Sequence, residues 1–213
     1  MRRVVVLALF LLFLSKTWCQ VLQNGGFENF QDFINNNPTY EDSFIVNKRT
    51  IADIKAWGGS DYKIESQDPS ITKKVIKKKI WGIVKNDTLY LNGIPITGLA
   101  GYVKVEILGK YSFMHPAFPI NSKIQDELGV DSPQFGYMFG AIGGAIQGAQ
   151  IAVKRISLIY NMETGEKMLL TKQSIFKMLQ NHLDLREEFM QEPDHENEEM
   201  LLKYLIMINK AEE

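Results

Sequence analysis

The residue types that enzymes use most often are sparse and scattered in this sequence. The three histidines, His115, His182 and His195, lie far apart, and no two stand at a metal-ligand spacing such as His-x3-His. There is no Gly-x-Ser-x-Gly elbow, and no Ser-x-x-Lys with its partner motifs. We therefore expect no metal and no cofactor, and the sequence favours a non-catalytic role without deciding whether the protein is an enzyme. A hydrolase that uses Asp61, Glu65 or His115 is an alternative.

A block of basic residues is the clearest charge feature of the chain, whose net charge is only −1. Such a block is typical of a solvated face, or of a patch that contacts anions or lipid headgroups. Nucleic-acid binding would require exposed aromatic residues between the lysines, and the one nearby, Trp81, is expected in the core. The candidate patch consists of Lys73, Lys74, Lys77, Lys78 and Lys79.

A glycine-rich segment, residues 139–152, is the most unusual stretch. Gly140, Gly144 and Gly148 recur every four residues, so a helix here would have one face almost free of side chains. The segment lacks the Gly-Lys-Ser/Thr ending of a phosphate-binding loop. Three interpretations stay open: a helix packed closely inside the protein or against a second copy, a membrane-inserted helix spanning residues 135–153, and an irregular loop. The expected partner is thus a second copy of the chain or a membrane, while any small-molecule ligand is unknown.

The N-terminus has the pattern of a secretory signal peptide over residues 1–19. Met1-Arg2-Arg3 is basic, Val4 to Leu14 is apolar, and cleavage is expected between Cys19 and Gln20. We therefore expect export to the periplasm or cell envelope. An uncleaved anchor and a lipid attached to Cys19 are the alternatives. The mature chain would contain no cysteine, which excludes disulfides and thiolate chemistry.

The pattern of apolar residues predicts an α+β fold in one compact unit, with an antiparallel β meander and hairpins, the glycine-zipper segment and C-terminal α-helices. We expect a sheet-rich domain over residues 20–171 and helices over 172–213 packed on it. Strand-like runs at Lys77 to Lys85 and Thr88 to Asn92 flank an Asn86-Asp87 turn. Further elements are expected as a short aromatic helix from Phe27 to Phe33, a strand from Gly101 to Leu108, a second hairpin around Met162 to Gly165, and three helices capped by Thr171, Asp184 and Asp194.

Several loose motifs, taken together, resemble a group of uncharacterised exported proteins common in Bacteroidota. The motifs are Phe27-x-x-Phe30-x-x-Phe33, Lys79-Ile80-Trp81-Gly82, Ile107-Leu108-Gly109-Lys110-Tyr111-Ser112, the glycine zipper, and Ile159-Tyr160-Asn161-Met162. The resemblance implies an envelope location and no activity. The sequence thus favours an uncharacterised exported structural or binding module. A membrane-associated protein that inserts or oligomerises through Gly140, Gly144 and Gly148 is the alternative, and the hydrolase is a second.

Overall fold

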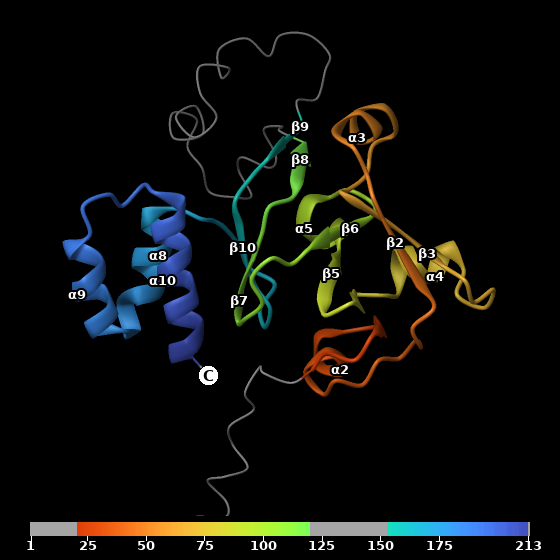
Figure 1. The fold of residues 1–213 in the computed structure, drawn as a ribbon, viewed down its shortest axis with the longest axis horizontal. Helices are drawn as coiled ribbons and strands as arrows, with labels where there is room; N and C mark the ends of the chain where they lie inside the picture. Colours follow the sequence, from red (N-terminus) through yellow and green to blue (C-terminus); the bar gives the residue numbers. More distant parts are fainter. Residues whose placement is uncertain (1–20, 120–152, 213) are drawn as a thin grey trace, which may run out of the picture. The chain divides into compact units, whose positions relative to one another are not determined.

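The computed structural model describes residues 21–119 and 153–212, and the described chain confirms the predicted α+β class (Figure 1). It divides into two compact units, one covering Gln23–Leu170 and the other containing the C-terminal helices from Thr171 onward. The expectation that these helices pack on the sheet-rich part stays a prediction. Residues 1–19, which the sequence predicts to be a signal peptide, and the glycine segment of residues 139–152, with Gly140, Gly144 and Gly148, lie outside the described residues.

The larger unit is built on a six-stranded antiparallel sheet with the strand order β1-β4-β5-β6-β3-β2. The edge strand β2 also lies close to β4, so the sheet curls. The strands are β1 (Gly25–Phe27), β2 (Phe44–Lys48), β3 (Tyr62–Ser66), β4 (Gly82–Lys85), β5 (Thr88–Asn92) and β6 (Tyr102–Lys104).

The turn between β4 and β5 confirms the predicted hairpin. Asn86 and Asp87 have φ angles of 51° and 55°, the left-handed conformation that a two-residue type I′ turn requires. The strand predicted from Gly101 to Leu108 is shorter than expected, because β6 ends at Lys104.

The sequence predicts one strand from Lys77 to Lys85, and this prediction is wrong for the first part of the run. Lys73 to Lys78 form helix α4 (Lys73–Lys78), and the strand begins only at Gly82. The Thr72 side chain accepts a hydrogen bond from the Val75 N–H and so caps the helix. A helix places Ile76 on the buried side and leaves the lysines of α4 exposed, as the structure shows. The helical spacing therefore matches the apolar and charged positions of this segment better than the alternation of a strand.

Three further short helices belong to this unit: α2 (Phe30–Ile34), α3 (Ile51–Trp57) and α5 (Gly93–Thr97). The aromatic run divides between two elements, because Phe27 ends β1 and α2 starts only after Asn29, which caps it. Helix α3 was not predicted. Its start is fixed by a capping box in which Thr50 and Asp53 each accept a backbone N–H of the other.

One face of the curled sheet holds a hydrophobic core against which α4 packs. Tyr102 is 2% exposed at its centre, and Ile76 and Ile80 come from α4 and the residues just after it. Burying such side chains contributes about 1.5–3 kcal/mol each. The cluster also contains Phe44, Ile64, Ile71 and Ile83.

Two smaller sheets complete the unit. The second predicted hairpin is confirmed by β10 and β11, and Gly165 in its turn has a φ angle of 74°. Strand β10 also pairs with β7, and β8 pairs with β9. The strands are β7 (Tyr111–Met114), β8 (Ala117–Pro119), β9 (Val153–Arg155), β10 (Leu158–Asn161) and β11 (Lys167–Leu169).

The C-terminal unit consists of α8 (Lys172–Met178), the 3-10 turn η2 (Leu179–Asn181), α9 (Leu183–Gln191) and α10 (Glu198–Ala211). Thr171 caps α8 as predicted. The other two predicted caps are wrong. Helix α9 starts two residues earlier, at Leu183, with His182 and not Asp184 at the N-cap position, and α10 is capped by Asn197, whose side chain accepts the Met200 N–H. Within the described residues, no helix combines the length and apolar character needed to cross a membrane.

Candidate functional site

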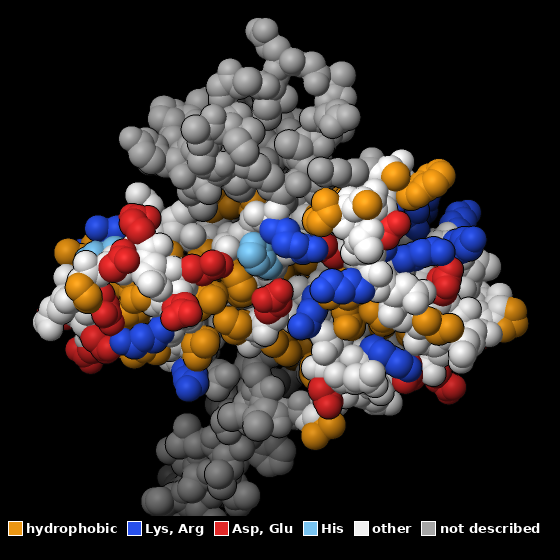
Figure 2. Space-filling view, turned by 45° about the horizontal axis from the view of Figure 1, so that its top comes forward, with side chains coloured by type: hydrophobic (Ala, Val, Ile, Leu, Met, Phe, Trp, Pro, Cys, Tyr) orange, Lys and Arg blue, Asp and Glu red, His pale blue; other side chains and the backbone are white. Residues whose placement is uncertain are grey.

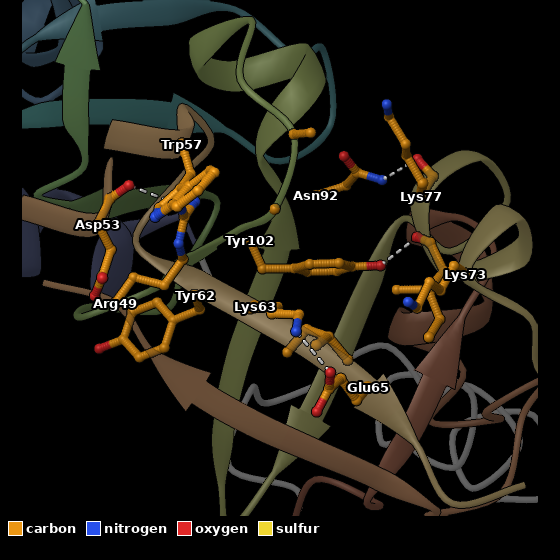
Figure 3. Close-up of a pocket in the computed structure, with 14 residues that line it drawn as sticks. Arg49, Asp53, Trp57, Tyr62, Lys63, Glu65, Lys73, Lys77, Asn92 and Tyr102 are labelled. Carbon is orange, nitrogen blue, oxygen red and sulfur yellow. Dashed lines mark hydrogen bonds and ion pairs between the residues drawn. The ribbon is translucent and has the colours of Figure 1, made fainter. Parts of the chain in front are cut away.

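A candidate site among the described residues is a cavity of about 570 Å³ in the larger unit, with residues of α3 and α4 at its two ends (Figure 3). Its volume is in the usual range for small-molecule sites. Figure 3 shows Trp57, Arg49 and Asp53 at one end, Lys73 and Lys77 at the other, and the Tyr102 ring between them. The cavity is therefore assembled from segments that are separated in the sequence.

The α4 end of the cavity is held in place by hydrogen bonds to the helix backbone. The Tyr102 hydroxyl donates to the Ile76 carbonyl at 2.7 Å, and the Asn92 side-chain amide donates to the carbonyls of Lys77 at 3.1 Å and Ile80 at 3.0 Å. The last carbonyls of a helix have no partner within the helix, so these bonds satisfy them. Burial raises the pKa of Tyr102, which keeps its phenol protonated as a donor.

The candidate lysines divide between two sides of α4. Lys73 and Lys77 are four residues apart, so they lie on the same helix face, and both line the cavity. Lys74 and Lys78 do not line it, and Lys79 is the C-cap residue of the helix. The prediction that all five contact anions or lipid headgroups stays a prediction, and the cavity geometry singles out Lys73 and Lys77.

Arg49 is fixed at the opposite end. Its guanidinium donates to the Ser60 carbonyl at 3.3 Å and to the Asp53 carbonyl at 3.1 Å. Gly59 has a φ angle of 92°, and a side chain there would strike the Arg49 guanidinium and the Ala100 carbonyl. The absence of a side chain at Gly59 thus allows Arg49 to lie across this loop.

Trp57 is the last residue of α3 and lines the same cavity although it is 84% exposed. An indole in this position offers a flat apolar surface and an N–H donor to a ligand. A single exposed apolar residue is ordinary on a protein surface. What distinguishes Trp57 is that it lies at a cavity that also contains arginine and lysine side chains.

Four cationic and two anionic side chains line the cavity. Asp53 accepts hydrogen bonds from the Thr50 hydroxyl and the Thr50 N–H, which together with Arg49 lower its pKa. Glu65 pairs with Lys63 at 2.7 Å, and this bond and the Lys63 charge lower the Glu65 pKa, with a further contribution from Lys73. Both carboxylates are therefore ionised and already engaged.

Lys73 and Lys77 make no ion pair within the part of the chain that the structure describes. Figure 2 shows Lys and Arg side chains distributed over the β-rich unit on the face in view, whereas Asp and Glu predominate on the C-terminal helices. Within the described residues, Lys73, Lys77 and Arg49 thus bring three cationic groups to the cavity without a direct ion pair to a carboxylate, although Arg49 lies near enough to Asp53, and Lys73 to Glu65, to lower the pKa of that carboxyl group.

A second cavity of about 460 Å³ shares one lining residue, Tyr62, with the first. The Tyr62 and Tyr90 rings meet edge to face at a centroid distance of 5.0 Å, and burial raises the pKa of both phenols. Lys85 lines this cavity and forms a bond to each Asp42 carboxylate oxygen, at 2.7 and 2.9 Å.

The residues considered for a hydrolase are not assembled as a catalytic group. The Asp61 carboxylate is 4% exposed and accepts from Arg155 at 2.6 Å and from the Ala117 N–H at 2.8 Å. His115 contributes its backbone carbonyl to the same Arg155 guanidinium, at 2.9 Å. Asp61 therefore joins the loop before β3 to strands β8 and β9, and Glu65, farther along β3, pairs with Lys63.

The other histidines belong to the C-terminal unit. His182 contacts Glu212 at 3.1 Å, and His195 contacts the Phe189 carbonyl at 2.8 Å. Among residues 21–119 and 153–212, no cluster of three or more His, Cys, Asp or Glu side chains is suited to a metal ion.

Lys73 and Lys77, which line this cavity, belong to the lysine block that is evident in the sequence, whereas Arg49 and Trp57 were not predicted. A signal for α3 was present, because Thr50-x-x-Asp53 is a capping pattern followed by Ile54 and Trp57. The position of Arg49 had no local signal, since its partners are carbonyls that only the folded loop brings near it.

The comparisons with known proteins give a family and nothing beyond it. A family model described as "Family of unknown function (DUF6563)" matches residues 25–212, which is most of the chain. No curated protein and no solved structure matches the chain significantly. The family therefore carries no activity, substrate or partner to this chain.

Proposed function

The chain belongs to the DUF6563 family of unknown function, and we propose that it is an exported, non-catalytic binding module of the cell envelope that holds an anionic ligand in the α3–α4 cavity. The observation that supports the proposal is that Lys73, Lys77, Arg49 and the exposed Trp57 all line one cavity of about 570 Å³. Exposed cations that surround a concave site attract anions and concentrate them there. The exported location is supported by the signal-peptide pattern of residues 1–19.

The acidic groups around the cavity support binding over catalysis. A general acid or base needs a carboxyl group that is free to exchange a proton with the substrate. Asp53 is engaged in the capping box of α3, Glu65 is paired with Lys63, and the pKa of each is lowered. Both carboxyl groups therefore stay ionised near neutral pH, where they act as fixed charges.

The proposal is tested by calorimetric titration of the chain that begins at Gln20 with inorganic phosphate, glucose 1-phosphate and digalacturonate. Lys73→Gln/Lys77→Gln should weaken binding of the anion that binds best by about ten-fold or more, because each lysine supplies a charge-assisted bond. The matched control, Lys74→Gln/Lys78→Gln, removes the same charge from the same helix outside the cavity and should change affinity by about two-fold at most. Equal losses in the two double variants, or no binding of any probe tighter than about 1 mM, would contradict the proposal.

Lipid headgroups present the same anionic chemistry, so vesicles form a second arm of the experiment. Vesicles of phosphatidylglycerol and phosphatidylcholine are compared with vesicles of phosphatidylcholine alone. Selective vesicle binding that the Lys73→Gln/Lys77→Gln variant loses, without binding of the soluble anions, identifies a membrane as the source of the ligand. Binding of the soluble probes without vesicle binding identifies a dissolved ligand, which a concave site between two helices favours.

The glycine zipper supplies a separate proposal for the partner of this chain. Gly140, Gly144 and Gly148, which lie outside the described residues, are proposed as a close-packing contact with a second copy or with a membrane. Gly144→Leu should disrupt assembly or stability if helices pack there. An unchanged sedimentation velocity profile and an unchanged unfolding midpoint would contradict that contact.

A further inference from the structure

The two cavities of the larger unit share one lining residue and present different chemistry. Tyr62 lines both of them, and its ring touches the Tyr90 ring, which lines only the second. Aromatic surface therefore occurs at Trp57 in the first cavity, at Tyr62 in both cavities, and at Tyr90 in the second. A small anion bound between Arg49 and Lys77 would leave the second cavity unused.

The second cavity is suited to a polar chain that carries further negative charge. Lys48, on edge strand β2, is exposed, lines this cavity and makes no ion pair within the described residues. Lys85 is already neutralised by Asp42, so Lys48 is the cation left to meet a ligand there. Thr88 and Asn86 add a hydroxyl and an amide at the same cavity, and such groups pair well with sugar hydroxyls.

We propose that the ligand is a linear acidic glycan whose chain runs from the first cavity past Tyr62 into the second. This inference rests on the proposed function and extends it by naming the class of ligand. A pyranose ring has one face of C–H groups, which packs on indole and phenol rings, and its carboxylate or sulfate pairs with lysine and arginine. An acidic peptide supplies the same charge but has no flat C–H face at each repeat to pack on Trp57, Tyr62 and Tyr90.

The inference predicts that affinity depends on chain length. Digalacturonate occupies the first cavity only, whereas α-1,4-linked hexagalacturonate reaches both. We expect the hexamer to bind at least about ten-fold more tightly, because the second contact becomes intramolecular once the first has formed. Maltohexaose, the uncharged chain with an α-1,4 linkage, should bind at least about ten-fold more weakly than hexagalacturonate.

Lys48→Gln separates the two cavities. This variant should weaken binding of the hexamer by about five-fold and change binding of the dimer by less than about two-fold, because only the longer chain reaches β2. Lys73→Gln/Lys77→Gln should weaken both ligands. Lys74→Gln is the control for a general loss of positive charge and should leave both affinities within about two-fold of the original.

The outcomes distinguish this inference from the function on which it rests. If dimer and hexamer bind equally and Lys48→Gln changes neither, the extended glycan is wrong while an anion site in the first cavity stands. If hexaglutamate binds as tightly as hexagalacturonate, the ligand is an acidic peptide and the glycan is wrong. If no acidic ligand binds at all, the proposed function fails as well.

Discussion

Replacing Asp61 with alanine tests whether this buried carboxylate is a structural anchor or a group held for chemistry. In the structure it accepts from the Arg155 guanidinium at 2.6 Å and from the buried Ala117 N–H at 2.8 Å. Asp61 therefore connects strands β8 and β9 to the loop before β3. The same loop positions Arg49, because the backbone N–H of Arg49 donates to the backbone carbonyl of Asp61 at 2.7 Å.

The size of the expected destabilisation follows from how deeply each hydrogen-bond partner of Asp61 is buried. The Ala117 N–H is left without an acceptor, which costs about 1–3 kcal/mol. The Arg155 side chain is 37% exposed, so water solvates the freed guanidinium and the loss of the ion pair adds about 1 kcal/mol. We expect Asp61→Ala to lower the free energy of unfolding by about 2–4 kcal/mol. Asp61→Asn keeps an acceptor for Ala117 and should cost about half as much.

Urea unfolding followed by tryptophan fluorescence measures this change. Trp57 and Trp81 both belong to the β-rich unit, so in the chain that begins at Gln20 the signal reports that unit alone. The double variant Asp61→Ala/Arg155→Met should be less destabilised than the two single variants added together, because the pair is lost only once. A loss below about 1 kcal/mol for Asp61→Ala would refute the anchoring role.

Three further predictions concern the elements that form the site and the C-terminal unit. Tyr102→Phe removes the hydroxyl that holds α4, and should cost about 1–2 kcal/mol in urea unfolding. The pKa of Tyr102 in the folded protein lies above its ordinary value of 10.0, so the stabilisation from its hydroxyl is fully present below pH 10 and is lost as the pH rises further. Between pH 7 and a pH above 10, the free energy of unfolding should therefore fall less for Tyr102→Phe than for the unmodified protein. Gly59→Val forces a side chain against Arg49, and should weaken anion binding in calorimetry. Gly58→Ala is the control for backbone strain, because Gly58 also has a positive φ, of 65°, but a side chain there meets no atom within 4 Å, so this variant should change binding less. In the C-terminal unit, the bond from Lys203 lowers the pKa of Glu192, so the stabilisation from this pair is present above pH 4.5 and is lost as the pH falls below it. Lys203→Met should therefore make the free energy of unfolding, measured by circular dichroism, depend less on pH in the acid range. An unchanged pH dependence would contradict the pairing.

Local turn and cap chemistry made part of this fold predictable. Asn86-Asp87 and Gly165 each marked a hairpin, because few residues adopt positive φ angles without strain. Thr171 marked a helix start for the same kind of reason, since its side chain accepts the N–H of Ser174. Signals of this type act within a few residues and need no knowledge of the rest of the molecule.

The errors at α4 and at Arg49 arose where contacts between distant residues decided the outcome, whereas α3 and the caps of α9 and α10 were local signals that were missed or misplaced. Lys77 to Lys85 alternates well enough to resemble a strand, but the burial of Ile76 and the bonds from Tyr102 and Asn92 favour a helix over its first part. The candidate site also depends in part on contacts between distant residues. The lysines were visible as a charge block, whereas the position of Arg49 depends on carbonyls placed by the folded loop.

The most direct test of the anion-binding account is a nuclear magnetic resonance titration of the chain that begins at Gln20 with digalacturonate. The chain then contains two indole N–H groups, and only Trp57 lines the cavity, while Trp81 packs against Phe30 and Phe33. The account predicts a saturable shift of the Trp57 indole signal, an unmoved Trp81 signal, and loss of the Trp57 shift in Lys73→Gln/Lys77→Gln. Equal shifts of both indole signals, or a Trp57 shift that persists in that variant, would contradict it.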